Sequence, residues 1–422
     1  MHRHFHRLLV GLMSALLLAA CAGAPQAAAP TSAPEPTAPA VPTDAPAPTA
    51  PAAPTSAPEP TVAGTPTEDD IKAGIQQALD LYAQAYNENN PELLKQAADQ
   101  TNAPFRRFIQ TRFDTFQESI RAGQERSYKV GEIKPRDFGF VQAKVETGGV
   151  VYDWTFRQVD GRWVMSEPTE AQLGKREKVE TEHFTFYTYP WADDVNGKLM
   201  EMMETARSNV LEKLGKVPEQ KTSVYIRPIF GVAGSQSPNT LAYYDRSSRA
   251  GDRIVLYAPE SYVFQAYDPA VGWEKELEAT LTHEYTHLVN NRSFTPIARM
   301  TDWMVEGLAE YVSDPNSARD RGVPLAVQSD QIIPIVDTSG QVNKQDLEHL
   351  TILEKDVSLA YGLAASLVDY INETYGGMDG FWKFAAAYDQ QQNLDKALQE
   401  AFGVSYEQFD QGWRAWLKAK YG

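Results

Sequence analysis

The chain has 422 residues, a formal net charge of −17 at pH 7 and one cysteine. A polyanion of this size argues against nucleic acid and anionic lipid headgroups as partners. A single cysteine permits neither an internal disulfide nor a zinc site built from thiolates. The length exceeds what one hydrophobic core usually serves, so we expect more than one domain.

The first 20 residues are expected to be a signal peptide that is removed. Arg3 and Arg7 form a basic start, and the apolar run at 8–18 is too short to span a bilayer. The next residues, Leu-Ala-Ala-Cys, resemble a bacterial lipobox, in which the cysteine carries lipid. The resemblance implies an extracytoplasmic lipoprotein of the bacterial cell envelope, anchored to the membrane through Cys21. The alternative is a plain secretory peptide with an incidental cysteine.

Residues 21–67 are expected to be a disordered tether behind the lipidated Cys21. Thirteen of the 27 prolines fall between 22 and 66, and "PTSAPEPT" occurs twice. A segment so poor in large apolar side chains cannot offset its ordering entropy, and its proline content favours an extended spacer. It would hold the folded part of the chain away from the membrane.

Residues 68–172 read as helices followed by antiparallel strands. Apolar residues recur at helical spacing over 71–86 and again over 91–121, and alternation typical of strands follows from 141. Asp160-Gly161 is a tight-turn dipeptide inside "VDGRWVM". This order and this hairpin resemble the NTF2-like superfamily, which implies an α+β cone. We expect an accessory domain that spaces or docks the next one, the alternative being a ligand-binding cone.

A second domain is expected from 176 to 422. "VETEHFTFYTY" (179–189) alternates as a strand, a helix ends at Gly215, and 222–230 and 252–259 read as further strands. The next helix begins near Trp273 and contains "HEYTH".

The HEYTH string places two imidazoles one helical turn apart, so that both can reach one ion. These are His283 and His287, with Glu284 between them. With eighteen residues intervening after His287, "WMVEGLAEY" supplies Glu306 on a helix expected over 302–313, for which Asp302 is the predicted N-cap. Two imidazoles and one carboxylate are a suitable ligand set for a catalytic zinc ion.

HEYTH, the eighteen-residue gap and "WMVEGLAEY" together resemble the gluzincin metallopeptidases, in the peptidase-MA-like branch related to the M1 aminopeptidases. The resemblance implies a mostly helical thermolysin- or M1-like domain with a small sheet, in a chain that is α+β as a whole. It also implies one zinc ion per chain, held by His283, His287 and Glu306, with Glu284 as general base.

The resemblance suggests two further roles. Thermolysin-like relatives carry an acidic residue one turn beyond the third ligand that accepts the far N–H of a ligand histidine, which implies this role for Glu310. The alternative is an exposed surface charge. M1-like relatives use a tyrosine to stabilise the oxyanion, which implies Tyr361 in "AYGLAASL". Its alternative role is core packing.

Two features bear on how substrate would bind. No Gly-x-Met-Glu-Asn-like stretch precedes the HEYTH helix, so an endopeptidase is expected rather than an aminopeptidase. The strand 253–259 is expected to be the sheet edge that pairs with extended substrate. His183 and His349 are expected to be structural or exposed.

The sequence therefore predicts a zinc metallopeptidase, most simply an endopeptidase, that hydrolyses peptide or protein substrates outside the cytoplasm by metal-activated water. Two alternatives stay open. One is a ligand- or partner-binding lipoprotein with a vestigial peptidase scaffold. The other is a zinc hydrolase of a non-peptide amide.

Overall fold

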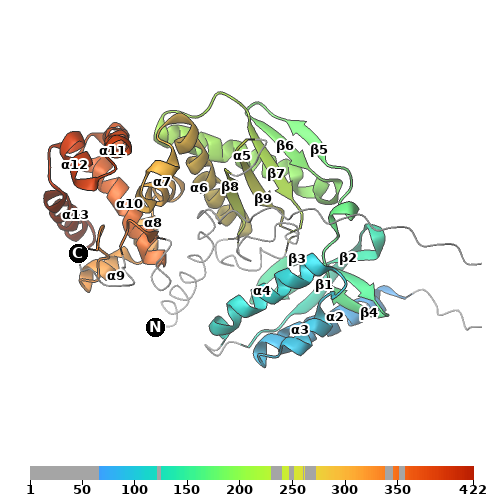
Figure 1. Cartoon of the computed structure of the whole chain (residues 1–422). Coiled ribbons are helices and arrows are strands. Elements are labelled where there is room, and N and C mark those ends of the chain that lie inside the picture. Colours follow the sequence, from blue (N-terminus) through green and yellow to red (C-terminus); the bar gives the residue numbers. More distant parts are fainter. Residues whose placement is uncertain are drawn as a thin grey trace, which may run out of the picture.

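The computed structural model describes the chain over residues 66–120, 125–229, 240–246, 251–259, 261, 272–337, 346–350 and 357–422. The predicted signal peptide and Cys21, and the predicted tether up to residue 65, lie outside the described residues. Among the helices that are described, none is long and apolar enough to cross a membrane. The described part of the chain contains two β-sheets and the helices around them (Figure 1).

The chain begins with three helices, α2 (Glu68–Asn87), α3 (Pro91–Ala97) and α4 (Ala103–Ile120). The prediction of one helical stretch over 91–121 was wrong, because the helix is interrupted between α3 and α4. Asp99 Oδ1 accepts the backbone N–H of Thr101 at 2.8 Å, and Asn102 Oδ1 accepts that of Phe105 at 3.2 Å. Short polar side chains that bond to nearby backbone in this way compete with helix continuation.

An antiparallel sheet follows, in which β1 (Lys129–Pro135), β2 (Phe140–Thr147), β3 (Val150–Val159) and β4 (Arg162–Met165) neighbour each other in chain order. Asp160 and Gly161 both have positive φ, 51° and 77°, so the predicted tight turn is present. Helix α2 packs against β1 and β4. We call α2–α4 with β1–β4 the N-terminal lobe. Its order of helices before strands is as predicted, and its membership of the NTF2-like superfamily stays a prediction.

The second sheet contains β5 (Glu177–Glu180), β6 (Phe184–Thr188), β7 (Thr222–Arg227), β8 (Ala242–Asp245) and β9 (Arg253–Tyr257), in the order β5-β6-β7-β9-β8. Strands β6, β7 and β9 are parallel, and the two flanking strands are antiparallel to their neighbours.

Two sequence-based predictions about this sheet were wrong. In place of the single strand expected over 179–189, the structure has two strands, β5 and β6. The chain folds back between them, and they pair antiparallel. The strand expected at the edge, β9, is interior, because its backbone pairs with β7 on one side and β8 on the other. Among the described strands, the edge on this side of the sheet is β8, a strand of four residues that is too short for alternation to reveal.

Helices α5 (Asp193–Leu214) and α6 (Trp273–Ser293) pack against the second sheet, and α7 (Asp302–Ser313) packs against α6. Asp302 is the first residue of α7, and Thr301 occupies the N-cap position that was predicted for Asp302. The remaining helices are α8 (Ser317–Asp320), α9 (Val323–Gln328), α10 (Val357–Thr374), α11 (Gly377–Gln391), α12 (Leu394–Phe402) and α13 (Tyr406–Tyr421). Short 3-10 helices lie at Asp137–Gly139, Glu170–Gln172, Pro190–Ala192 and Ile297–Arg299.

The N-terminal lobe is joined to the second sheet through a small core of its own. Phe140, Leu173, Trp191 and Ile229 form a buried cluster, in which the rings of Phe140 and Trp191 meet edge to face at 5.5 Å. Arg136 of the lobe donates to the backbone carbonyl of Trp191 and lies 4.7 Å above its ring. The lobe is therefore docked by apolar packing as well as by the chain connection.

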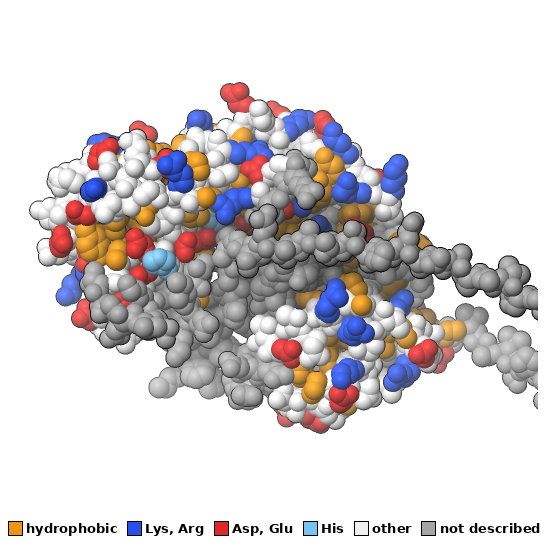
Figure 2. All heavy atoms as spheres, in the orientation of Figure 1, with side chains coloured by type: hydrophobic (Ala, Val, Ile, Leu, Met, Phe, Trp, Pro, Cys, Tyr) orange, Lys and Arg blue, Asp and Glu red, His pale blue; other side chains and the backbone are white. Residues whose placement is uncertain are grey.

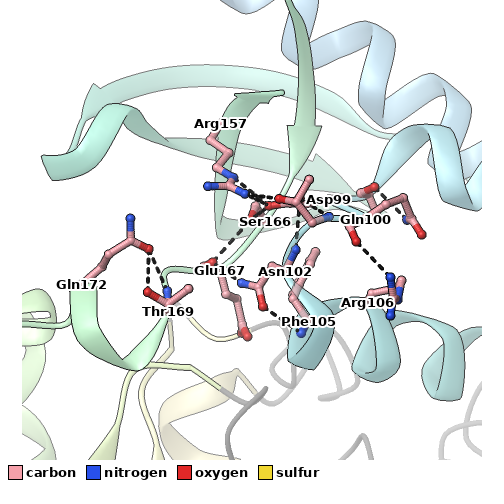
Figure 3. Close-up of polar contacts among 12 residues, drawn as sticks. Asp99, Gln100, Asn102, Phe105, Arg106, Arg157, Ser166, Glu167, Thr169 and Gln172 are labelled. Atoms are coloured by element: carbon pink, nitrogen blue, oxygen red, sulfur yellow. Dashed lines mark hydrogen bonds and ion pairs between the residues drawn. The ribbon is translucent and has the colours of Figure 1, made fainter. Parts of the chain in front are cut away.

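A buried polar network holds the segment that leaves the lobe (Figure 3). The Asp99 carboxylate accepts hydrogen bonds from Ser166 Oγ and Arg157 Nε, both at 2.7 Å, and Asn102 Nδ2 donates to the carbonyl of Glu167 at 2.7 Å. Burial alone would raise the pKa of Asp99, but the hydrogen bonds of Ser166 and Thr101 and the charge of Arg157 lower it. On the face of the molecule in Figure 2, acidic and basic side chains are interspersed over the surface.

Candidate metal centre

Helix α6 carries the HEYTH residues on its buried side. His283 is 1 % exposed and His287 is 2 % exposed, and Leu281 and Leu288 on the same helix are fully buried. The two imidazoles are one turn apart, and their Nε2 atoms lie 3.1 Å from each other. Two ring nitrogens at this distance need a proton or a cation between them, because two lone pairs would otherwise face each other.

Helix α7 brings the third predicted ligand to the same point. Glu306 is 6 % exposed, and its Oε2 lies 3.3 Å from Nε2 of His283 and 3.5 Å from Nε2 of His287. The next residue, Gly307, lets α7 approach α10 closely, since a Cβ there would lie 2.5 Å from the carbonyl oxygen of Ala364. The glycine in "VEGLAEY" thus has a packing role beside the ligand.

These three ligand atoms fit a tetrahedral zinc ion. Zinc bonds to nitrogen and oxygen are about 2.0–2.2 Å, so two ligand atoms of a tetrahedron lie roughly 3.3–3.5 Å apart. The observed separations are 3.1, 3.3 and 3.5 Å. Within the described part of the chain, Glu306 Oε2 makes no hydrogen bond despite its closeness to both rings. A buried carboxylate oxygen without a hydrogen bond is costly, and a metal ion would satisfy it.

The pKa values of His283 and Glu306 also indicate that this site favours a positive charge beside the carboxylate. Burial alone would lower the pKa of His283, but the Glu306 and Glu310 carboxylates raise it to about 10. Burial alone would raise the pKa of Glu306, but the nearby imidazoles of His287 and His283 lower it to about 2. In the metal-free site the raised pKa of His283 therefore favours a proton on that imidazole, and its positive charge balances the Glu306 carboxylate as a metal cation would.

Glu284 lies beside this group on α6 and faces the sheet edge. It is 2 % exposed, and its Oε2 accepts the backbone N–H of Tyr244 in β8 at 2.8 Å. Burial raises the pKa of Glu284, and the nearby histidines His283 and His287 offset part of that rise. A carboxylate with a raised pKa next to a metal site is suited to taking up and releasing a proton.

Glu310 is buried, at 2 % exposed, which excludes the alternative of an exposed surface charge. Its Oε1 lies 3.4 Å from Nδ1 of His283, the ring nitrogen that points away from Glu306. On its other side, Arg321 donates from Nε to Oε2 at 2.8 Å and from Nη2 to Oε1 at 2.9 Å, and Ser317 Oγ donates to Oε2. Burial alone would raise the pKa of Glu310, but Arg321 lowers it to about 2.

Tyr361 lies in α10 and is 3 % exposed. Its ring faces the guanidinium of Arg321, with Cζ 5.6 Å from the ring centroid. The structure therefore brings the Tyr361 ring beside Arg321, which binds Glu310, and its role as oxyanion donor stays a prediction.

The other two histidines of the folded part make different contacts. His183 Nδ1 bonds to Glu204 at 2.7 Å. His349 has an exposed side chain that bonds to Asp346 at 3.0 Å, in an acidic group that also includes Glu348. Both histidines thus have carboxylate partners outside the HEYTH group, as expected for structural or exposed residues.

Sequence reasoning missed two residues that contact this site. Arg321 binds Glu310 from 11 positions away, and Tyr244 contacts Glu284 from 40 positions away. Neither lies in a periodic pattern or a recognisable motif, so no sequence signal pointed to them.

Comparison with known proteins places the site within a matched region. Residues 255–419 match the family model of the Peptidase MA superfamily, a range that contains HEYTH, Glu306 and Glu310. A search of curated proteins found no match.

Solved structures with similarity to the chain include an M1 zinc metallopeptidase from Deinococcus radiodurans, at 12 % identity and a TM-score of 0.30. That comparison covers 70 % of this chain and 62 % of the other. A glutamate-to-alanine mutant of that protein, and a two-domain M1 zinc metallopeptidase mutant bound to L-arginine, match at the same identity and TM-score. In both, 69 % of this chain and 61 % of the other are covered, so the chain spans less than two thirds of the length of these structures.

Proposed function

We propose that this protein is a zinc-dependent metallopeptidase, with one zinc ion per chain held by His283, His287 and Glu306. The observation that carries the proposal is the spacing of the three ligand atoms. They lie 3.1–3.5 Å from one another, close to the distances between ligand atoms in a tetrahedral zinc site. The match of residues 255–419 to the Peptidase MA superfamily supports it. Zinc in such a site would supply Lewis acidity and lower the pKa of water.

The protein residues around that site would orient the ligands and move the proton. Glu310 Oε1, which lies 3.4 Å from Nδ1 of His283, would accept a hydrogen bond from a protonated Nδ1, and Nε2 of that ring would then be the metal ligand. Glu284 takes a proton from the attacking water and delivers it to the leaving amine, a task for which its raised pKa is suited. Tyr361 is proposed as the oxyanion donor, supported by its family position alone.

We further propose that the enzyme is an endopeptidase of the bacterial cell envelope, tethered through lipid on Cys21, with residues 68–172 as an NTF2-like accessory domain. The lipobox-like segment and the absence of a Gly-x-Met-Glu-Asn-like stretch support this. Among the described strands, the sheet edge beside Glu284 is β8, so we assign the binding of extended substrate backbone to β8 rather than to β9.

The test is digestion of a broad peptide library by the purified protein, with and without chelator. We expect cleavage that chelator abolishes and that added zinc restores. The matched control is Glu284→Gln, which should bind zinc like the wild type and lose hydrolysis. Undiminished turnover in Glu284→Gln would remove Glu284 as the base, and metal-loaded wild-type protein that cleaves no peptide would favour a non-peptide amide or a binding role.

A further inference from the structure

Tyr244 contacts the proposed base through its backbone. It lies in the edge strand β8 opposite Ile254 of β9, and its N–H turns away from β9 toward Glu284 Oε2, 2.8 Å away. Among the described strands, β8 pairs with β9 alone. A four-residue edge strand with one neighbour has few backbone hydrogen bonds to fix it, so its position beside Glu284 needs another restraint.

The side chain of the same residue supplies that restraint. The Tyr244 hydroxyl donates to Asp252 Oδ2 at 2.7 Å and accepts from Asn291 Nδ2 at 3.0 Å. Asn291 lies on α6 one helical turn after His287, so the helix that carries the two histidines also holds the tyrosine. Tyr244 is thus fixed at two points, its hydroxyl at Asn291 and its N–H at Glu284.

The acidic partner in this contact is itself neutralised and fixed. Arg292, the next residue of α6, donates from Nε to Asp252 Oδ1 at 2.9 Å and from Nη1 to Thr222 Oγ1 at 3.2 Å. Asp252 therefore accepts from a guanidinium and a phenol at once, which are strong, directional contacts. We call Tyr244, Asp252, Asn291 and Arg292 the edge-strand clamp.

We propose that Tyr244 is a positioning residue for Glu284: the edge-strand clamp holds β8 so that its N–H fixes the carboxylate of the base. This inference rests on the proposed function for its catalytic consequence, while the geometric part stands on the hydrogen bonds alone. Catalysis by a general base depends on placement, and a misplacement of about 1 Å can cost on the order of 100-fold in rate. A clamp that serves stability alone would leave the rate unchanged.

The test compares Tyr244→Phe with a matched control, Tyr370→Phe. Each substitution removes one partly or fully buried hydroxyl, and Tyr370 lies in α10 with its hydroxyl 3.4 Å from that of Tyr375. We expect Tyr244→Phe to bind zinc as the wild type does, to keep KM, and to lower kcat by roughly 10- to 100-fold. Tyr370→Phe should keep kcat. An unchanged kcat in Tyr244→Phe, or an equal fall in both variants, overturns the proposal.

A second measurement does not depend on activity. Hydrogen exchange of the amide of residue 244 reports whether its N–H is held by Glu284. In the metal-free protein, this amide should exchange at least about tenfold faster in Tyr244→Phe and in Glu284→Ala, and at the wild-type rate in Tyr370→Phe. Unchanged protection in Tyr244→Phe overturns the clamp. If the wild type cleaves no peptide, the proposed function fails, and the exchange rates still decide whether the clamp holds Glu284.

Discussion

Replacing Glu310 with glutamine tests whether the contact behind His283 matters for metal binding. Both carboxylate oxygens of Glu310 face Arg321, which donates to one at 2.8 Å and to the other at 2.9 Å. In the Glu310→Gln variant, either orientation of the amide points its NH2 group at a guanidinium donor. The side chain must therefore turn away, and the contact to His283 Nδ1 at 3.4 Å is lost with it.

Two magnitudes follow from this geometry. Loss of a partner behind a metal-bound histidine typically costs 10- to 100-fold in metal affinity, about 1.4–2.7 kcal/mol. Removing one member of a buried ion pair destabilises a protein by about 3–5 kcal/mol, and Glu310 is buried. We therefore expect Glu310→Gln to bind zinc 10- to 100-fold more weakly and to unfold at lower denaturant concentration.

Zinc affinity would be measured by competition with a chromophoric chelator, and stability by urea unfolding of the metal-free protein. Glu373→Gln is the matched control, because Glu373 of α10 forms a largely exposed ion pair with Lys420 of α13, and its replacement should leave both quantities unchanged. A Glu310→Gln variant that binds zinc within about threefold of the wild type would show that Glu310 does not orient His283.

Three further predictions concern the site and the fold. In the metal-free protein, the raised pKa of His283 stabilises the fold fully below its ordinary value of 6.5, and this is lost as pH rises through about 10. The lowered pKa of Glu306 stabilises the fold above its ordinary value of 4.5, and this is lost as pH falls through about 2. Thermal melts with chelator should thus show the largest contribution of this pair between pH 4.5 and 6.5, and a Glu306→Gln variant with the same profile would contradict the pairing. Gly307→Ala places a Cβ 2.5 Å from the Ala364 carbonyl oxygen. We expect the free energy of unfolding in urea to fall by about 1–3 kcal/mol and zinc binding to weaken. Wild-type values of both quantities would refute the close approach of α7 and α10. Trp191→Ala removes the largest side chain of the cluster between the N-terminal lobe and the second sheet, so calorimetry should show the lobe unfolding separately at lower temperature, and a single unshifted transition would argue against docking.

The ligand group could be predicted because most of its geometry is local. Two positions four apart on a helix are neighbours whatever surrounds them, so HEYTH alone placed His283 beside His287. Glu306 is on another helix, so its contact with the two histidines was predicted only from the spacing between the two motifs. The structure brings all three together, while their roles as ligands and that of Glu284 as base stay proposals.

The parts that sequence could not predict depend on contacts between distant segments. Strand β8 has four residues, so alternation could not identify it, and β9 was wrongly placed at the edge. The break between α3 and α4 depends on the side chains of Asp99 and Asn102, which also bond to Ser166 and to the carbonyl of Glu167 far along the chain. Those long-range contacts favour ending the helix, whereas apolar spacing favours continuing it.

Charge balance gives a separate argument for the kind of ion this site would take. Glu284, Glu306 and Glu310 are all at most 6 % exposed, and Arg321 forms an ion pair with Glu310. With neutral imidazoles, as metal binding requires, three carboxylates and one guanidinium leave two negative charges in a buried volume. Buried charge of that size is strongly unfavourable without compensation, and a divalent cation supplies it. A proton passed from water to Glu284 would leave a hydroxide in the same site, so the net charge of the group would not change during the transfer. The divalent cation that balances the buried carboxylates would thus keep the site neutral throughout proton transfer by Glu284.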